Sequence, residues 1–175
     1  MLWGRAVVLA LVAMFALTGC VFSLSGGGDK PAKPSHAEYL PPRDEANWAK
    51  MQAFLDNYKH QEGVKVLDNG IAYRVLTQGR GGGRKATWAS TVIVRYKGKL
   101  TNGTVFDEVK PGEKPVEFEL NSVVKGWQEV VPLMRDGDKW EVALPPDFAY
   151  GRAGKPPTIG PDQVLVFEIE LVGIK

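Results

Sequence analysis

The sequence predicts an α+β domain with an antiparallel sheet of about five strands and one short helix in its core. Segments in which apolar and polar residues alternate follow one another between residues 71 and 171, and this period of two is typical of half-buried strands. A single helical pattern interrupts them in that region. Its apolar positions, at i, i+3, i+4 and i+7, are Trp127, Val130, Val131 and Met134. Consecutive strands, rather than strands alternating with helices, favour an antiparallel sheet.

The composition indicates one globular domain with an additional N-terminal segment. The chain has 175 residues, of which 44% are hydrophobic and 24% are charged, and its formal net charge is +2. A charge so close to zero gives no support for nucleic-acid binding. Both histidines, His36 and His60, and the one cysteine, Cys20, precede residue 86. Residues 86–175 therefore cannot supply a Cys/His zinc site or a Ser-His-Asp triad, and we expect neither a metal nor a cofactor.

Residues 1–19 are predicted to be a signal peptide of the bacterial lipoprotein type. Arg5 provides a basic start, and the apolar run that follows, residues 6–17, is shorter than the roughly 20 residues that span a bilayer. Small residues before the lone Cys20 resemble a lipobox, which implies cleavage before Cys20 and lipidation of that residue. The alternative is a plain signal peptide or a short anchor. Val21 after the cysteine favours the outer membrane over the inner one, with the domain facing the periplasm.

Residues 20–42 are predicted to be a tether that holds the domain off the membrane. Gly, Ser, Pro and Lys dominate this segment. Such a composition is flexible where glycine and serine prevail and stiffer at Pro41-Pro42.

Residues 43–85 are predicted to contain an N-terminal helix and a lead-in strand. The helix, residues 44–61, begins at Asp44, a residue type that caps helices. One face carries Trp48, Met51, Leu55 and Tyr58. Two interpretations of this face remain open: it docks on the domain, which is then a monomer, or it joins two chains in a weak homodimer. The lead-in strand is residues 71–76.

Residues 86–175 contain the remaining alternating segments. The longest, residues 92–100, reaches a tight-turn dipeptide at Asn102-Gly103 and continues to Asp107. The later strands are expected at residues 116–120, 139–144 and 164–171.

Three motifs in this region, together with the last strand, resemble the FKBP-type peptidyl-prolyl cis-trans isomerases. They are Tyr96-x-Gly-x-Leu-x-Asn-Gly-x-x-Phe106-Asp107, then Val123-Val124-x-Gly-Trp127, and then Pro145-x-x-Phe-Ala-Tyr150-Gly. The resemblance covers roughly residues 86–175, and more weakly residues from about 63. It implies an antiparallel half-barrel sheet wrapped around the short helix, with a pocket between them, in an isomerase domain of residues 86–175.

The resemblance also implies the residues of a pocket that binds a proline of a polypeptide substrate. The catalytic positions would be Tyr96, Phe106, Asp107, Trp127, Tyr150 and Phe167. The substrate-binding positions would be Val116, Phe118, Val123, Val124 and Ile159. Val116 stands where many members carry an aromatic residue, and Lys155 adds a cation to the loop of residues 153–161 that would cover one side. Macrolide inhibitors of the family are implied as further ligands.

The implied activity is isomerisation of X-Pro bonds during protein folding in the bacterial envelope. Amide resonance sets the barrier to this rotation, and no covalent bond is made or broken. A dry aromatic pocket would favour the twisted amide over the planar, more polar one. Two alternatives belong to other classes: a chaperone or binding module with little isomerase activity, and an envelope lipoprotein with a purely structural domain.

Overall fold

The computed structural model describes residue 40, residues 42–79 and residues 84–175. All of them belong to one compact unit. The predicted signal peptide, Cys20 and nearly all of the tether lie outside the described residues, as does the centre of the glycine-rich loop at residues 80–83. Every helix within the described ranges falls short of the length and apolar character that a bilayer crossing requires.

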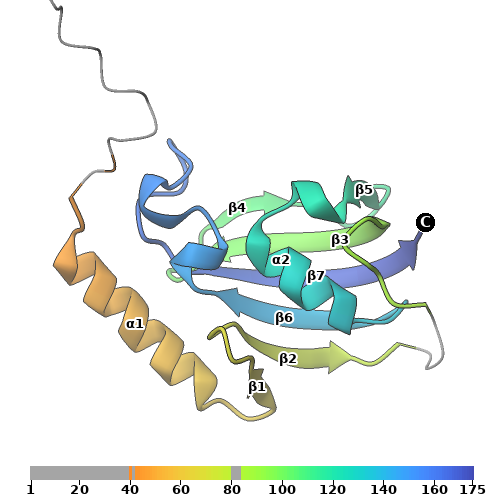
Figure 1. The fold of residues 1–175 in the computed structure, drawn as a ribbon, viewed down its shortest axis with the longest axis horizontal. Coiled ribbons are helices and arrows are strands. Elements are labelled where there is room, and N and C mark those ends of the chain that lie inside the picture. Colours follow the sequence, from red (N-terminus) through yellow and green to blue (C-terminus); the bar gives the residue numbers. More distant parts are fainter. Residues whose placement is uncertain (1–39, 41, 80–83) are drawn as a thin grey trace, which may run out of the picture. The chain divides into compact units, whose positions relative to one another are not determined.

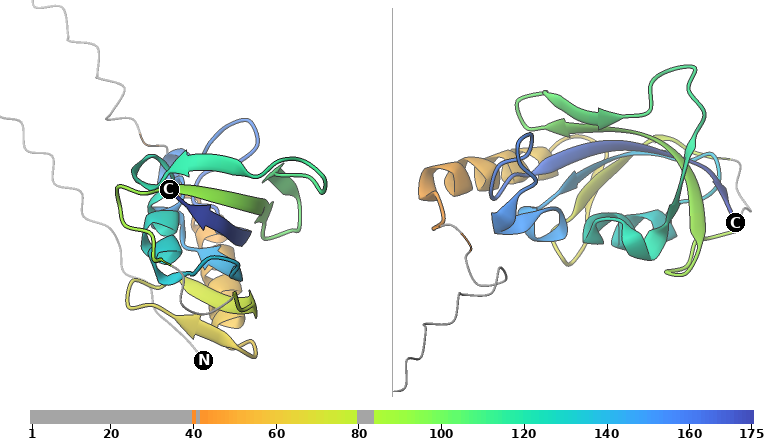
Figure 2. Two further views of the ribbon diagram at one scale, coloured as in Figure 1. Left: turned by 90° about the vertical axis from the view of Figure 1, so that its right-hand side faces the viewer. Right: turned by 90° about the horizontal axis from the view of Figure 1, so that it is seen from above.

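Seven strands form one antiparallel sheet, so the predicted fold class is confirmed. Their order is β1-β2-β6-β7-β3-β4, and β5 pairs separately with β3. Figures 1 and 2 show that the sheet is curved and that the short helix α2 lies across one of its faces. The bounds are Val64–Val66 (β1), Ala72–Thr77 (β2), Thr91–Leu100 (β3), Val105–Glu108 (β4), Val116–Glu119 (β5), Lys139–Leu144 (β6) and Leu165–Ile174 (β7).

The predicted number of about five strands is too low. The sequence predicts no strand at β1, because three residues are too few to display an alternating pattern. It predicts an apolar segment after the turn at the place of β4, but this segment is not counted as a separate strand. Both lie at an end of the strand order, where β1 pairs only with β2 and β4 only with β3.

The longest strand pairing of the sheet joins β3 and β7, whose register runs from Val92 opposite Ile174 to Leu100 opposite Leu165. The predicted turn after β3 is present, with Gly103 at a φ of 86° that favours glycine. The backbone N–H of Thr104 donates to Asn102 Oδ1 at 3.0 Å, which stabilises this turn. The alternating pattern of β3 therefore predicts which of its faces points inward, and Asn102-Gly103 predicts the point where the chain reverses.

The helix α2, Lys125–Val130, fills the inner side of the curved sheet and continues into the 3₁₀ turn Val131–Leu133. Its four predicted apolar residues, Trp127, Val130, Val131 and Met134, are all buried, as expected from their spacing. Together with inward side chains of the sheet they form the main hydrophobic core.

The helix α1, Glu45–Lys59, packs against the opposite face of the sheet. Asp44 caps it as predicted, because its Oδ1 accepts hydrogen bonds from the N–H groups of Ala46 and Asn47. The buried side chains Met51, Leu55 and Tyr58 meet small sheet residues in a second apolar cluster. Within one chain, this face therefore docks on the sheet. Trp48 differs from its predicted place on this face, since it is half-buried and stacks against the Arg43 guanidinium.

Candidate active site

A cavity of about 440 Å³ opens between the inner face of the sheet and the start of α2. Nine of the eleven predicted catalytic and substrate-binding residues line it. The full lining is Tyr96, Phe106, Asp107, Phe118, Ser122, Val123, Val124, Trp127, Tyr150, Lys155 and Phe167. The residues come from four strands, one helix and two loops, so only the folded sheet brings them together.

Gly98 on β3 makes room for two of the aromatic rings. A Cβ atom at this position would lie 2.5 Å from Cζ of Phe106 and 2.9 Å from Cε1 of Phe167, both closer than atoms normally approach. Gly98 stands directly opposite Phe167 on β7 and Asp107 on β4 in the sheet register. Because it lacks a side chain, the two rings can lie over the strand at a centroid separation of 5.6 Å.

Trp127 is the centre of the aromatic lining. Its ring meets three others edge-to-face, at centroid distances of 5.3 Å to Tyr96, 5.5 Å to Phe167 and 6.1 Å to Phe118. Each such pair adds about 0.5–1.5 kcal/mol beyond the area that it buries. Trp127 is itself 4% exposed, so the floor of the cavity is held rigidly by its own neighbours.

Tyr96 and Asp107 form a polar pair at the rim. The Tyr96 hydroxyl donates to Oδ2 of Asp107 at 2.7 Å. Burial, and then this hydrogen bond, raise the pKa of Tyr96 well above its ordinary value, so the phenol keeps its proton at neutral pH. The bond orients the ring of Tyr96 and leaves a carboxylate at the exposed edge of the cavity.

The covering loop, residues 150–162, forms another part of the rim. Tyr150 and Lys155 line the aromatic cavity, and the Lys155 ammonium lies 5.3 Å from the centroid of the Tyr150 ring. Ile159 lines a neighbouring cavity of about 240 Å³, which Phe106 and Asp107 share. Ile159 is 2% exposed, so it supports the rim from the side and does not face the aromatic cavity.

Val116 lies outside the cavity. It is 37% exposed at the first position of β5, opposite Val94. Phe118, two residues further along the same strand, supplies the aromatic wall instead, with its ring 6.0 Å from that of Tyr96. Val116, one of the predicted substrate-binding residues, therefore does not line this cavity.

Two lining residues were absent from the predicted site. Lys155 was noted only as a cation on the loop, and its place at the cavity depends on how that loop folds back. Ser122 ends the 3₁₀ turn Leu120–Ser122. The available signal for Ser122 was its position directly before Val123, a predicted site residue.

The site contains the groups for binding an apolar ring rather than for bond-breaking chemistry. Its walls are aromatic and valine side chains, and its polar groups lie at the rim. Among the residues that the structure describes, no group of three or more His, Cys, Asp or Glu could hold a metal ion. A curved antiparallel sheet around one short helix, with an aromatic cavity between them, is the architecture of FKBP-like domains.

Comparisons with known proteins agree with this class. The family model described as FKBP-type peptidyl-prolyl cis-trans isomerase matches residues 82–172. A second family model, the domain amino terminal to FKBP-type peptidyl-prolyl isomerase, matches residues 35–75. The chain belongs to the FKBP-type peptidyl-prolyl cis-trans isomerase family.

Several relatives come from bacteria. The peptidyl-prolyl cis-trans isomerase Mip of Coxiella burnetii is 44% identical over 129 residues, which are 74% of this chain and 55% of the relative. The outer membrane protein MIP of Legionella longbeachae is 40% identical over 131 residues, or 75% of this chain and 55% of that protein. The chain thus spans about half the length of the curated relatives it matches.

Two solved structures are also similar. A peptidyl-prolyl cis-trans isomerase from Pseudomonas syringae pv. tomato superposes with a TM-score of 0.71 at 37% identity, over 77% of this chain and 98% of that one. FkpA from Escherichia coli superposes with a TM-score of 0.68 at 34% identity, over 75% of this chain and 62% of that one.

Proposed function

We propose that this chain is a peptidyl-prolyl cis-trans isomerase that acts on proline-containing polypeptides in the bacterial envelope. The observation that carries the proposal is the cavity of about 440 Å³ in which aromatic rings surround Trp127. Membership of the FKBP-type family supports the same activity. The cavity fits this reaction because rotation about an X-Pro bond requires no nucleophile and no bond cleavage.

The catalysis would come from differential binding of the twisted amide. A planar X-Pro amide is dipolar and is well solvated by water, whereas the twisted amide has lost resonance and carries less charge on its oxygen. An aromatic cavity that excludes water therefore disfavours the planar form relative to the twisted one. Each 1.36 kcal/mol of such a difference accelerates exchange about tenfold.

Polar groups at the rim would hold the substrate backbone in place. Val124 directly precedes α2 and lines the cavity, and the resemblance to the family implies that its backbone N–H binds a substrate carbonyl. The Tyr150 hydroxyl and Asp107 lie on other parts of the rim and would make further polar contacts. Tyr96, Phe106 and Phe167 would surround the proline ring itself.

The activity can be tested by measuring cis-to-trans exchange of a short X-Pro peptide by NMR. A chain that begins after Cys20 should accelerate exchange, and the folded variants Phe167→Ala and Asp107→Ala should lower turnover. A macrolide inhibitor of the family should block the acceleration. A well-folded chain that gives no acceleration would contradict the proposal and favour the binding-module interpretation. Unchanged turnover in both variants would contradict the assigned site.

We also propose that the chain is anchored by a lipid on Cys20 with its domain in the periplasm. The small residues before this lone cysteine support lipidation. The Legionella relative is named an outer membrane protein, which agrees with an envelope location. Cys20→Ser should abolish incorporation of a labelled fatty acid and move the chain out of the membrane fraction. Label that persists in this variant would rule out the anchor.

A further inference from the structure

The covering loop is closed at its base and braced in its middle by backbone hydrogen bonds. At the base, the N–H of Asp162 donates to the carbonyl of Gly151 at 2.9 Å. Further out, Lys155 and Ile159 exchange two N–H to carbonyl bonds, of 2.7 and 3.0 Å. The loop is therefore one unit, and a shift at residue 162 moves Tyr150 and Lys155 at the cavity rim.

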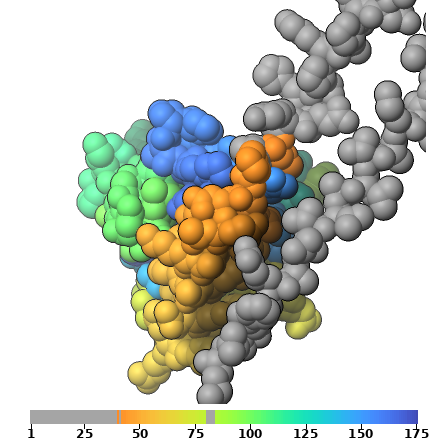
Figure 3. Space-filling model, turned by 90° about the vertical axis from the view of Figure 1, so that its left-hand side faces the viewer, coloured from red at the N-terminus to blue at the C-terminus, as the bar shows by residue number. Residues whose placement is uncertain are grey.

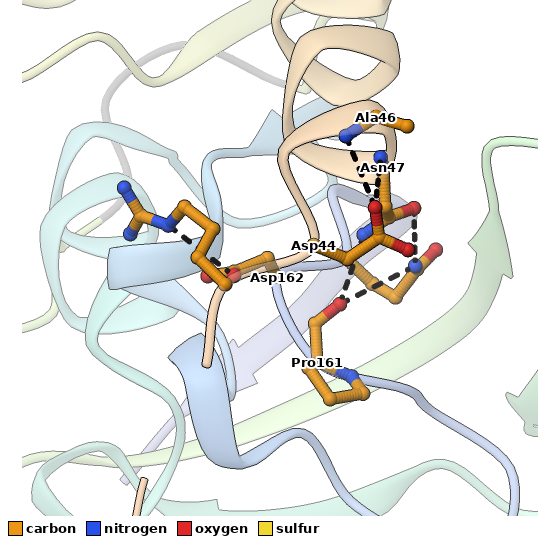
Figure 4. Close-up of polar contacts among 7 residues, drawn as sticks. Asp44, Ala46, Asn47, Pro161 and Asp162 are labelled. Carbon is orange, nitrogen blue, oxygen red and sulfur yellow. Dashed lines mark hydrogen bonds and ion pairs between the residues drawn. The ribbon is translucent and has the colours of Figure 1, made fainter. Parts of the chain in front are cut away.

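The start of α1 contacts this base, although more than 100 residues separate the two in sequence. The amide nitrogen Nδ2 of Asn47 donates to the carbonyl of Pro161 at 3.1 Å. Nε2 of Gln163 donates to Oδ1 of Asn47 at 3.2 Å. Figure 4 shows these bonds around the first turn of α1, and Figure 3 shows the orange helix against the blue segment that contains the loop.

Arg43 contacts the same base through a charge pair. Its Nε lies 3.4 Å from Oδ2 of Asp162, and the Asp162 side chain is 2% exposed. A carboxylate buried to this extent is costly unless a cation compensates it. The Arg43 guanidinium is also placed in advance, because it lies 3.9 Å from the centroid of the Trp48 ring.

The backbone conformation of Asp162 also restricts which residues can occupy this position. Its φ is 53°, in the left-handed region that only glycine, asparagine and aspartate visit readily. Asp162 thus combines an unusual backbone conformation with a buried side chain that pairs with Arg43, just before α1. The position of Asp162 depends on this contact as well as on the bond from its own N–H to Gly151.

We propose that Arg43 and Asn47 are positioning residues of the isomerase: they hold the base of the covering loop so that Tyr150 and Lys155 stay at the rim of the aromatic cavity. This inference rests on the proposed function. The floor of the cavity, Trp127 and Phe167, belongs to α2 and β7 and lies in the main hydrophobic core, whereas the buried residues of α1 belong to the second cluster. Loosening the loop should therefore weaken substrate binding while the floor is unchanged.

The first test measures loop opening without reference to activity. In the full chain of residues 1–175, kept in a non-denaturing detergent, we expect Arg43→Ala and Asn47→Ala to accelerate hydrogen exchange of the Lys155 and Ile159 amides about three- to tenfold, the equivalent of one lost hydrogen bond. Arg43→Lys should restore part of the protection. Lys59→Ala, at the far end of the same helix, is the matched control and should leave both amides unchanged.

The second test measures catalysis of a short X-Pro peptide with the same chains. Arg43→Ala should raise KM about three- to tenfold with little change in kcat. The reason is that a loosened loop weakens substrate binding, whereas the aromatic floor that stabilises the transition state is unchanged. Asp162→Asn keeps a residue that tolerates the positive φ but removes the charge. We expect it to raise KM similarly, and the double variant to be no worse than either single one.

The outcomes separate the inference from the proposed function. Unchanged amide exchange in Arg43→Ala and Asn47→Ala would overturn the positioning role. A fall in kcat that follows the loss of folded protein, with KM constant, would also overturn it, because that is the signature of a merely structural contact. A wild-type chain without turnover would overturn the proposed function, and the exchange comparison would still decide whether Arg43 and Asn47 hold the loop.

Discussion

At the scale of single residues, Gly98 determines how closely two cavity rings approach the sheet. Gly98→Ala would place a methyl group within 3 Å of both Phe106 and Phe167, so the rings must move into the space where a proline would bind. We expect kcat/KM for an X-Pro peptide to fall at least about tenfold, the effect of roughly 1.4 kcal/mol of lost transition-state binding.

The matched control for this prediction is Gly173→Ala on the neighbouring strand β7. A Cβ atom there would meet only Cδ1 of Ile93 at 3.6 Å, an ordinary contact. This variant should keep its turnover, and circular dichroism should show both variants folded. Equal turnover in the two variants would contradict the view that Phe106 and Phe167 line the working cavity.

Sequence reasoning identifies the aromatic lining well but cannot choose between residues two apart on one strand. Val116 and Phe118 point to the same side of β5. Only the folded structure shows which one reaches the cavity, since Val116 is 37% exposed whereas the Phe118 ring lies 6.0 Å from that of Tyr96. The resemblance to the family pointed to Tyr96, Phe106 and Trp127, because each belongs to one of the motifs that carry it.

At the scale of elements, a polar contact helps to hold α1 to the sheet. The Tyr58 hydroxyl donates to Oε1 of Glu141 on β6 at 2.9 Å, and Nη2 of Arg74 on β2 lies 2.8 Å from the same oxygen. Because Tyr58 is 3% exposed, Tyr58→Phe should lower the free energy of unfolding by about 1.5 kcal/mol, as for a buried hydrogen bond to a charged group.

Urea denaturation measures this loss directly. In a Glu141→Ala background the same change should cost less, since the hydroxyl has already lost its acceptor. An equal cost in both backgrounds would show that the Tyr58 hydroxyl does not stabilise the fold through Glu141.

The outer face of the sheet carries a charge cluster that makes stability depend on pH. The hydrogen bond from Lys99 lowers the pKa of Glu168 below its ordinary value of 4.5, burial opposes this shift, and the hydrogen bond from Lys139 adds to it. A carboxyl whose folded pKa is lowered stabilises the fold above its unfolded pKa, and this contribution disappears as the pH falls through the folded value.

Glu168→Gln should therefore reduce the loss of unfolding free energy between pH 7 and about pH 3. Glu129→Gln removes the same charge from an exposed position on α2 and serves as the control. Urea titrations at the two pH values give the comparison. A pH dependence in Glu168→Gln as steep as in the wild type would show that other groups control the acid loss.

Element prediction succeeded where the apolar pattern was long enough to repeat. The face of α1 and the buried side of α2 each contain apolar residues at helical spacing. The helix α1 begins within one residue of its predicted start, and Trp127 and Val130 of the predicted core helix lie on α2. The strand β1, with three residues, carries no such pattern. Its place in the sheet is determined by the partner strand β2, which lies beyond a turn.

At the scale of the whole molecule, the docked helix bears on the oligomeric state. The apolar face that could have joined two chains is already used, since Met51, Leu55 and Tyr58 are 2–3% exposed within one chain. We expect residues 37–175 to sediment as a monomer at micromolar concentration. A dimer would mean that α1 leaves its own sheet or that a different surface pairs.

Contacts between distant parts of the chain were beyond sequence reasoning. Nothing in the spacing near Arg43 or Asn47 indicates that they meet residues 161 and 162, because a single ion pair or amide contact leaves no periodic signal. The same holds for the stacked pair Tyr73 and Trp140, whose rings lie 4.5 Å apart on β2 and β6. Only the order of strands in the folded sheet brings such residues together.

The strand order also has a consequence for how the chain folds during synthesis. The final strand, β7, lies in the middle of the sheet between β6 and β3, yet a ribosome makes it last. Until it emerges, β6 and β3 lack their common neighbour and leave unpaired edges open to other chains. Pairing that joins such distant segments is also slow. The domain therefore cannot complete its sheet until β7 has been made, and until then its open strand edges can pair with other chains.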